Sequence, residues 1–144
     1  MWLIYAVAAS VIWGLSYAAG GRVLQRGVSP VVLFFLDLVF GLAALGAYLT
    51  VSGKWSSVPA QVRSLGPQWV WLAVAVVATT AGNFLIFLAI AGKNATLASL
   101  IEITYPLFVA LFAWVLFRDA QLTWPTALGA LLILAGVVVI GRCA

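Results

Sequence analysis

The chain has 144 residues, of which 66% are hydrophobic and 7% charged, and its mean hydropathy is +1.22. Soluble domains carry roughly 25% charged residues, so this composition excludes a protein with a water-facing surface. The sequence contains no His and a single Cys, Cys143, which excludes an internal disulfide and disfavours a Cys or His metal site. The net charge of +4 is spread over the connections between apolar runs, and no connection has the basic cluster that binds nucleic acid.

Five apolar runs reach the length of about 20 residues that a helix needs to cross a bilayer. They cover about 2–19, 30–50, 67–91, 94–117 and 124–141. The fold class predicted from them is an all-α integral membrane protein, one domain over residues 1–144 with five transmembrane helices. The N-terminus lacks the basic segment of a signal peptide, so the first run is expected to be retained.

The first two spans each carry one notable side chain in an otherwise apolar run. Trp13 lies in the first span, which has no charged residue before Arg22. The second span begins at Ser29-Pro30, where proline suits the first turn of a helix, and it contains Asp37. Two interpretations of Asp37 are open: a functional acid inside the membrane, or an acid that pairs with Arg22 or Arg26 or reaches the nearer interface.

The connection from 51 to 66 is the longest, and its mixed composition suits the interface between membrane and water. The third span follows it and contains Asn83, with Thr79 and Thr80 one turn earlier. Asn83 is either a ligand contact or a residue that joins helices by hydrogen bonds, as polar side chains do in membranes.

The fourth span contains the strongest candidate residue, Glu102. Asn94 is a good N-cap for this helix, and Ser99, Glu102 and Pro106 lie at i, i+3 and i+7, on one helix face. Pro106 has no N–H for the carbonyl of Glu102, which predicts a bend there. A bent helix beside an acid lines a cavity more readily than it faces lipid. Glu102 is therefore a candidate for binding and releasing a proton; the alternative is a protonated side chain that hydrogen-bonds Asn83 or Ser99.

Gly129 and Gly136 lie seven residues apart, on one face of the fifth span. Small residues at this spacing let helix backbones approach closely. The pair predicts a dimer contact, and packing within the bundle explains it equally well.

The notable residues of the first four spans are predicted at one depth. Glu102 lies about 12 Å from the start of its span and Asp37 about 10 Å from the start of its own, at 1.5 Å per residue. Trp13 and Asn83 lie about 10–12 Å from the ends of the first and third spans, below the same membrane face.

The odd number of spans places the two termini on opposite faces. One face carries the N-terminus, Lys54, Arg63 and Arg118, and the other carries Arg22, Arg26, Lys93 and Arg142. This balance gives no positive-inside bias. Two arrangements are open: a single orientation, or two oppositely inserted copies that pair as an antiparallel dimer.

Three segments carry a family resemblance, and together they cover nearly the whole chain. They are Trp13-Gly14 followed by Ser29-Pro30, the stretch 94–119 with Pro106 and Trp114, and the closing helix from Gly129 to Gly136 onward. In this order they resemble the EamA-type domain of the drug/metabolite transporter superfamily.

The resemblance implies a transporter of small metabolites, amino acids or drugs. Most members carry two such five-helix domains related by inversion, so this chain resembles a half-size member that needs a second copy. Inverted repeats place the substrate site between them, near the midplane of the membrane. Two departures affect the details: Asp37 stands near a position where the family often has Arg, and Arg118-Asp119 replaces a common Gly-Glu. The related small multidrug exporters keep their essential acid in the first span, where this chain has none.

The sequence therefore predicts a secondary transporter in the cytoplasmic membrane of a bacterium or archaeon, exporting a small-molecule substrate against protons. It is expected to act in the lipid bilayer either as a homodimer, for which an antiparallel arrangement is open, or as a pair with another half-transporter. The residues predicted to bind substrate or couple protons are Glu102, Asp37, Asn83, Trp13, Tyr105 and Ser99, with Trp13 and Tyr105 as aromatic walls. Pro106 is the predicted bend. No cofactor and no metal is predicted.

Rival functions come from other classes. A non-transporting subunit of a larger membrane complex would use its polar residues to hold helices together. An enzyme acting on lipid is disfavoured because the chain has no His, no metal-ligand set and no nucleophile beside a base. A passive channel is disfavoured because no helix carries a recurring line of polar residues.

Overall fold

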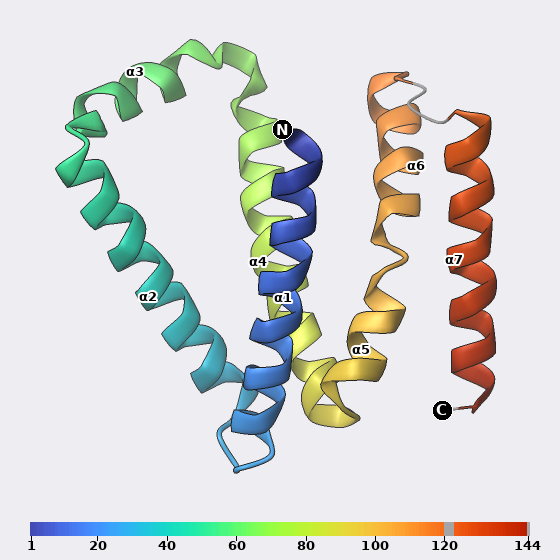
Figure 1. Ribbon diagram of the computed structural model, residues 1–144. Coiled ribbons are helices and arrows are strands. Elements are labelled where there is room, and N and C mark those ends of the chain that lie inside the picture. The colour runs from blue at the N-terminus through green and yellow to red at the C-terminus, as the bar shows by residue number, and fades with distance from the viewer. Residues whose placement is uncertain (120–122, 144) are drawn as a thin grey trace. The chain divides into compact units, whose positions relative to one another are not determined.

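The computed structural model describes residues 1–119 and 123–143, and in this part of the chain the secondary structure is entirely helical. The elements are α1 (Trp2–Leu24), α2 (Pro30–Val51), η1 (Lys54–Ser56), α3 (Ser57–Ser64), η2 (Gly66–Gln68), α4 (Trp69–Gly92), α5 (Ala95–Glu102), α6 (Tyr105–Phe117) and α7 (Trp124–Cys143). Figure 1 shows them in chain order.

Five stretches of the described residues are long and apolar enough to cross a membrane. They are Trp2–Leu24, Pro30–Val51, Gly66–Gly92, Ala95–Phe117 and Trp124–Arg142. The predicted fold class, an all-α membrane protein with five transmembrane helices, is confirmed.

The chain divides into two compact units. The first unit comprises Met1–Gly21 and Ala89–Ala144, and the second comprises Arg22–Leu88. The boundaries fall inside α1 and α4, so both helices contribute residues to both units. The description of residues 1–144 as one domain stays a prediction.

In the second unit, α2 begins with a side-chain cap and ends beside a short crosswise helix. Ser29 is the N-cap of α2, and its Oγ accepts a hydrogen bond from Val32 N at 3.3 Å. After α2, Trp55 Nε1 donates to Thr50 Oγ1 at 2.9 Å, which folds the connection back onto the end of the helix. The connection from 51 to 66 contains α3, which runs across from the end of α2 toward α4 (Figure 1).

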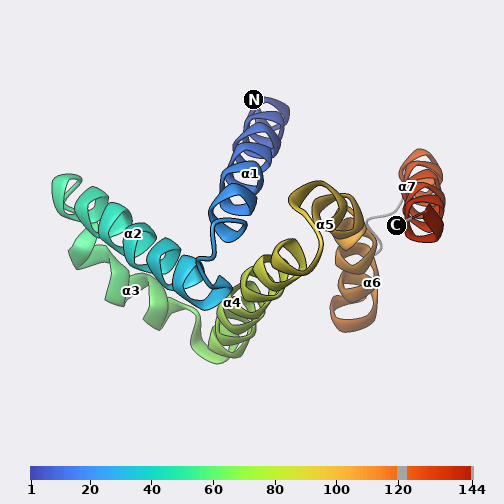
Figure 2. The same ribbon diagram turned by 90° about the horizontal axis from the view of Figure 1, so that it is seen from below.

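In the first unit, the fourth span is two helices rather than one. Asn94 caps α5 by accepting a hydrogen bond from Leu97 N at 2.8 Å, as the sequence predicted. Helix α5 ends at Glu102, Ile103 and Thr104 form a turn, and α6 begins at Tyr105. Figure 1 shows this interruption as a short non-helical stretch, and in Figure 2 the two helices do not share one axis.

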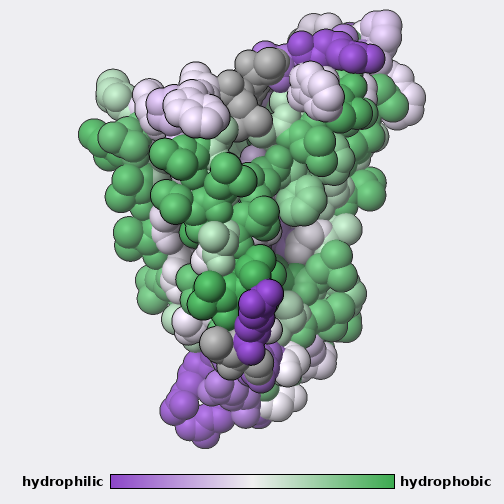
Figure 3. Space-filling model, turned by 90° about the vertical axis from the view of Figure 1, so that its right-hand side faces the viewer, coloured by the Kyte–Doolittle hydropathy of each residue, from purple (hydrophilic) through white to green (hydrophobic). Residues whose placement is uncertain are grey.

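Most apolar side chains of the chain are exposed in the structure. Among the described residues, the buried hydrophobic side chains are Tyr17, Ile86, Phe87, Ile90, Ala98 and Ala113. The face that α7 presents is hydrophobic along its middle and hydrophilic toward its ends (Figure 3). Such a surface is suited to contact with lipid or with other membrane helices, because large apolar side chains such as Leu131 and Leu132 are exposed on α7.

Candidate functional site

The first unit brings Glu102 together with a residue of the first span, Tyr17. The Tyr17 hydroxyl donates a hydrogen bond to Oε1 of Glu102 at 2.9 Å. Tyr17 is buried, with 9% of its surface exposed, whereas Glu102 is half-buried. A carboxyl group inside a membrane-spanning stretch therefore has a polar partner on another helix, which lowers the cost of placing it there.

A close approach between α1 and α5 sets the position of this pair. A Cβ atom on Gly21 would lie 3.1 Å from the Cβ of Ala95 and 3.5 Å from Ile90 Cγ2. Gly21 and its neighbour Gly20 are buried, and a side chain on Gly21 would require Ala95 to shift. Tyr17 lies one turn before Gly21, and Glu102 lies two turns after Ala95, so the glycine contact brings the hydroxyl within reach of the carboxylate.

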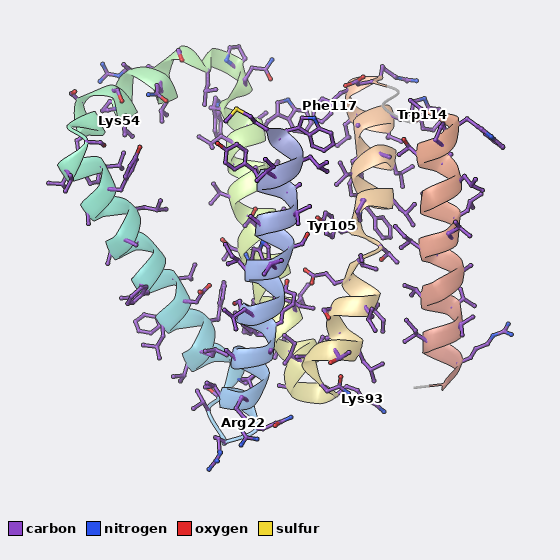
Figure 4. All side chains as sticks on the ribbon, in the orientation of Figure 1. Arg22, Lys54, Lys93, Tyr105, Trp114 and Phe117 are labelled. Atoms are coloured by element: carbon purple, nitrogen blue, oxygen red, sulfur yellow. The ribbon has the colours of Figure 1, made fainter. Side chains whose placement is uncertain are left out.

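The pair lies well inside the spans. Tyr17 is about 10 Å before the end of α1, and Glu102 is about 10 Å after the start of α5, at 1.5 Å per residue. Lys93 precedes α5 at one end of the fourth span, and Trp114 and Phe117 lie in the last turns of α6 at its other end (Figure 4). A basic residue and large aromatic residues at opposite ends are typical of a stretch that crosses a bilayer.

The backbone is interrupted directly after Glu102. Pro106 occupies the first turn of α6 and has no N–H, so the helical bond to the Glu102 carbonyl cannot form. The turn is held instead by hydrogen bonds that span three residues rather than four, from Thr104 N to Ile101 O at 3.2 Å and from Leu107 N to Thr104 O at 3.0 Å. Interrupted helices inside a membrane occur where the backbone lines a cavity or a binding site.

Two further aromatic residues of the first unit, Trp13 and Tyr105, bear on the pair. The rings of Trp13 and Tyr17 lie 5.5 Å apart between centroids, one turn from each other on α1. Tyr105 begins α6 at the level of the interruption (Figure 4). Trp13 and Tyr105 are 49% and 61% exposed, so both offer ring surface to a bound molecule.

The other polar candidates make local bonds. Ser99 Oγ donates to Thr96 O at 3.0 Å, and Asn83 Nδ2 donates to Thr79 O at 3.0 Å, each within its own helix. Within the first unit, the observed side-chain partner of Glu102 is Tyr17 and not Ser99. Asp37 is exposed on α2 and belongs, with Asn83, to the second unit. Their role in the site stays a prediction.

Tyr17 is the residue that the sequence interpretation missed. Two signals pointed to it: it lies four residues after Trp13, on the same helix face, and it has the same depth as Glu102. A tyrosine in an apolar helix carries no charge, however, and its bond to Glu102 joins residues 85 positions apart. No local pattern reveals such a contact.

An apolar groove lies between α6 and α7, next to the interruption. It has a volume of about 670 Å³, and its lining includes Ile103, Pro106, Gly129 and Leu134. A Cβ atom on Gly129 or Gly136 would meet no described atom within 4 Å. Neither glycine is therefore used for close packing of helices within the described chain, and the dimer contact predicted for them stays a prediction.

The described residues include no set of side chains arranged to bind a metal ion. Among residues 1–119 and 123–143, no three His, Cys, Asp or Glu side chains are grouped so that they could hold a metal ion.

Comparison with known proteins identifies the family. The model of the EamA-like transporter family matches residues 1–142, nearly the whole chain. No curated protein and no solved structure gave a match. The match covers all five spans and agrees with the resemblance of Trp13-Gly14, 94–119 and the closing helix. The chain therefore belongs to the EamA-like transporter family.

Proposed function

We propose that this protein is a secondary transporter that exports a small organic solute in exchange for protons, acting as a dimer. Membership of the EamA-like transporter family supports transport of a drug or metabolite across a membrane. In the proposal, Glu102 binds either a proton or the substrate, and the exchange of one for the other couples their movements.

The observation that carries the proposal is the hydrogen bond from Tyr17 to Glu102 inside the first unit. An ionisable side chain at the centre of a membrane helix costs about 2.5–3.5 kcal/mol on insertion scales, so such residues usually serve a function. Glu102 keeps part of its surface exposed, and it accepts a hydrogen bond from the Tyr17 hydroxyl. A carboxylate held in this way can exchange a neutral donor for a ligand without rearranging the helix that bears it.

The interruption at Ile103 and Thr104 supports a movement of the fourth span. Transporter sites are typically built on discontinuous helices, which change direction around a bound substrate. We propose that α5 and α6 rock about this turn, because Pro106 prevents the two helices from joining into one continuous helix.

A second five-helix unit completes the transporter in this proposal. The balanced charges at the span ends permit both orientations in the membrane, which favours an antiparallel homodimer. A Cβ atom on Gly129 or Gly136 would meet no described atom within 4 Å, so a second copy could approach α7 closely at this face. Pairing with another half-transporter uses the same face.

Transport by purified protein in liposomes tests the function. Liposomes with a trapped pH dye receive a panel of amino acids, polyamines and lipophilic cations, and solute-driven proton movement is recorded. We expect movement with the wild type and none with Glu102→Gln or Glu102→Ala. Asp119→Asn removes an acid outside the spans and serves as the matched control.

Two results would contradict the proposal. If Glu102→Ala loses all transport while Glu102→Gln keeps it, the carboxyl is needed for packing and not for proton coupling. If no solute moves protons and the purified chain falls apart on its own, the chain is a subunit of a larger complex.

A further inference from the structure

We infer that the substrate is an organic ammonium ion, bound between the Glu102 carboxylate and the rings of Trp13 and Tyr17. This inference rests on the proposed function and names the substrate class of the same site. Three observations on the first unit lead to it: the charge of the site, its aromatic lining and the neutral donor that now occupies the carboxylate.

The first observation is the distribution of charge. The basic side chains of the first unit are Lys93, Arg118 and Arg142. Lys93 precedes α5, Arg118 follows α6, and Arg142 lies in the last turn of α7, so all three lie at span ends. The helix interiors of this unit contain no basic residue to balance Glu102. A cationic ligand balances this carboxylate, whereas an anionic ligand meets a like charge in a medium of low dielectric constant.

The second observation is the ring pair. Trp13 and Tyr17 present two aromatic rings with centroids 5.5 Å apart, and Trp13 keeps 49% of its surface exposed. The face of an aromatic ring attracts a cation, most strongly in Trp, and carboxylate with aromatic rings is a recurring way to hold an ammonium group. Trp13 contacts Tyr17, and Tyr17 contacts Glu102, so together the three side chains suit a molecule with a charged end and an apolar body.

The third observation is the Tyr17 hydroxyl, which donates to Glu102 at 2.9 Å. An ammonium N–H donates to the same oxygen and adds a full positive charge, which makes a hydrogen bond about twice as strong. The cation therefore displaces the hydroxyl, together with the proton that the proposed function assigns to Glu102, and Tyr17 donates to the carboxyl group when no substrate is bound. Tyr17 on α1 is the titratable group that the structure places in hydrogen-bond contact with Glu102 in this unit.

Binding of four ligands with one aromatic body tests the substrate class. The probes are 2-phenylethylammonium, neutral 2-phenylethanol, anionic 3-phenylpropionate and zwitterionic phenylalanine, titrated by calorimetry into the purified dimer. We expect the ammonium ion to bind at least tenfold more tightly than the other three. Equal or tighter binding of the anion or the zwitterion overturns the inference.

Variants assign the binding to the three side chains. Glu102→Gln is expected to weaken binding of the ammonium ion at least tenfold. Trp13→Ala is expected to weaken it about 2- to 30-fold, which is the range of a cation–ring contact. Tyr17→Phe removes only the competing hydroxyl, so its affinity is expected to equal or exceed that of the wild type. Trp2→Ala removes an exposed tryptophan from the same helix and is expected to bind like the wild type. Melting and gel filtration without ligand establish that each variant is folded.

The outcomes separate the substrate class from the transport proposal. If another solute drives Glu102-dependent proton movement while the ammonium ion does not bind, the substrate class is wrong and transport stands. If the ammonium ion binds with the expected dependence on Glu102 and Trp13 but moves no protons in liposomes, the site stands and proton-coupled transport is wrong.

Discussion

At the scale of single residues, the account depends on one acid and its hydroxyl donor. Glu102 was predictable from the sequence, because an acid stands out in an apolar span and Pro106 marks the place. Tyr17 was not predictable, since its contact depends on how α1 meets α5. Ser99 was predicted on the helix face of Glu102 and Asn83 at its depth; each donates a hydrogen bond within its own helix, and their part in the site stays a prediction.

Tyr17→Phe tests the structural contribution of the hydrogen bond. Loss of one bond between membrane helices is expected to lower the free energy of unfolding by about 0.6 kcal/mol and at most about 1.7 kcal/mol. Tyr5→Phe, an exposed tyrosine on the same helix, is the control and is expected to unfold like the wild type. Unfolding in increasing denaturing detergent gives the comparison, and equal curves for the two variants would show that the bond contributes no stability.

At the scale of elements, apolar length located the five spans to within a few residues, because crossing a bilayer requires about 20 apolar residues. The connection from 51 to 66 was recognised as unusual, but its helix α3 was not foreseen. Pro106 predicted a bend in one helix, whereas the structure has a complete turn at Ile103 and Thr104 between two helices. The position of a proline shows which backbone hydrogen bond is missing, but the conformation of the neighbouring residues determines how long the interruption of the helix is.

The contact between α1 and α5 gives a prediction about Gly21. Gly21→Leu forces a side chain against Ala95 and Ile90, so it is expected to destabilise the protein by about 1–3 kcal/mol, the usual cost of overpacking. It also separates Tyr17 from Glu102, so ammonium binding loses its dependence on the Tyr17 hydroxyl. Gly14→Leu on the same helix meets no atom within 4 Å among the described residues and serves as the control. Equal melting temperatures for the two variants would contradict a tight helix contact at Gly21.

The interruption of the fourth span gives a prediction about Pro106. Pro106→Ala supplies an N–H that can donate to the Glu102 carbonyl, so α5 and α6 are expected to join and to move less freely. We expect a severalfold slower transport rate with ligand affinity and thermal stability preserved. Pro125→Ala, at the first turn of α7 where proline disturbs no helical bond, is the control. Transport by Pro106→Ala at the wild-type rate would show that the interruption is not needed for movement.

At the scale of the whole molecule, composition alone identified a membrane protein, and the family model extends that identification to a transporter family. The pairing of units depends on surfaces that only a second copy completes. The balance of Lys and Arg and the open glycines of α7 are the features that bear on it. The proposed substrate class depends on side chains that two helices, α1 and α5, bring together, which no single segment of the sequence reveals.

An antiparallel dimer predicts that the chain inserts in both orientations. Cys143 is the only thiol of the sequence, so a membrane-impermeant maleimide reports which side the C-terminus occupies. In intact cells about half of the thiol is expected to react, and all of it after lysis, because the charges give no orientation bias. Complete reaction from one side only would rule out the antiparallel arrangement and favour a partner half-transporter or a parallel pair.

The claim that one carboxyl group holds either a proton or the substrate is tested most directly by proton release on binding. Purified wild-type protein in weakly buffered solution at neutral pH is titrated with 2-phenylethylammonium, whose own amine stays protonated under these conditions. The account predicts that binding releases protons from the wild type and none from Glu102→Gln at matched occupancy. Binding to the wild type without proton release, or equal release from Glu102→Gln, would contradict the exchange of proton and substrate at Glu102.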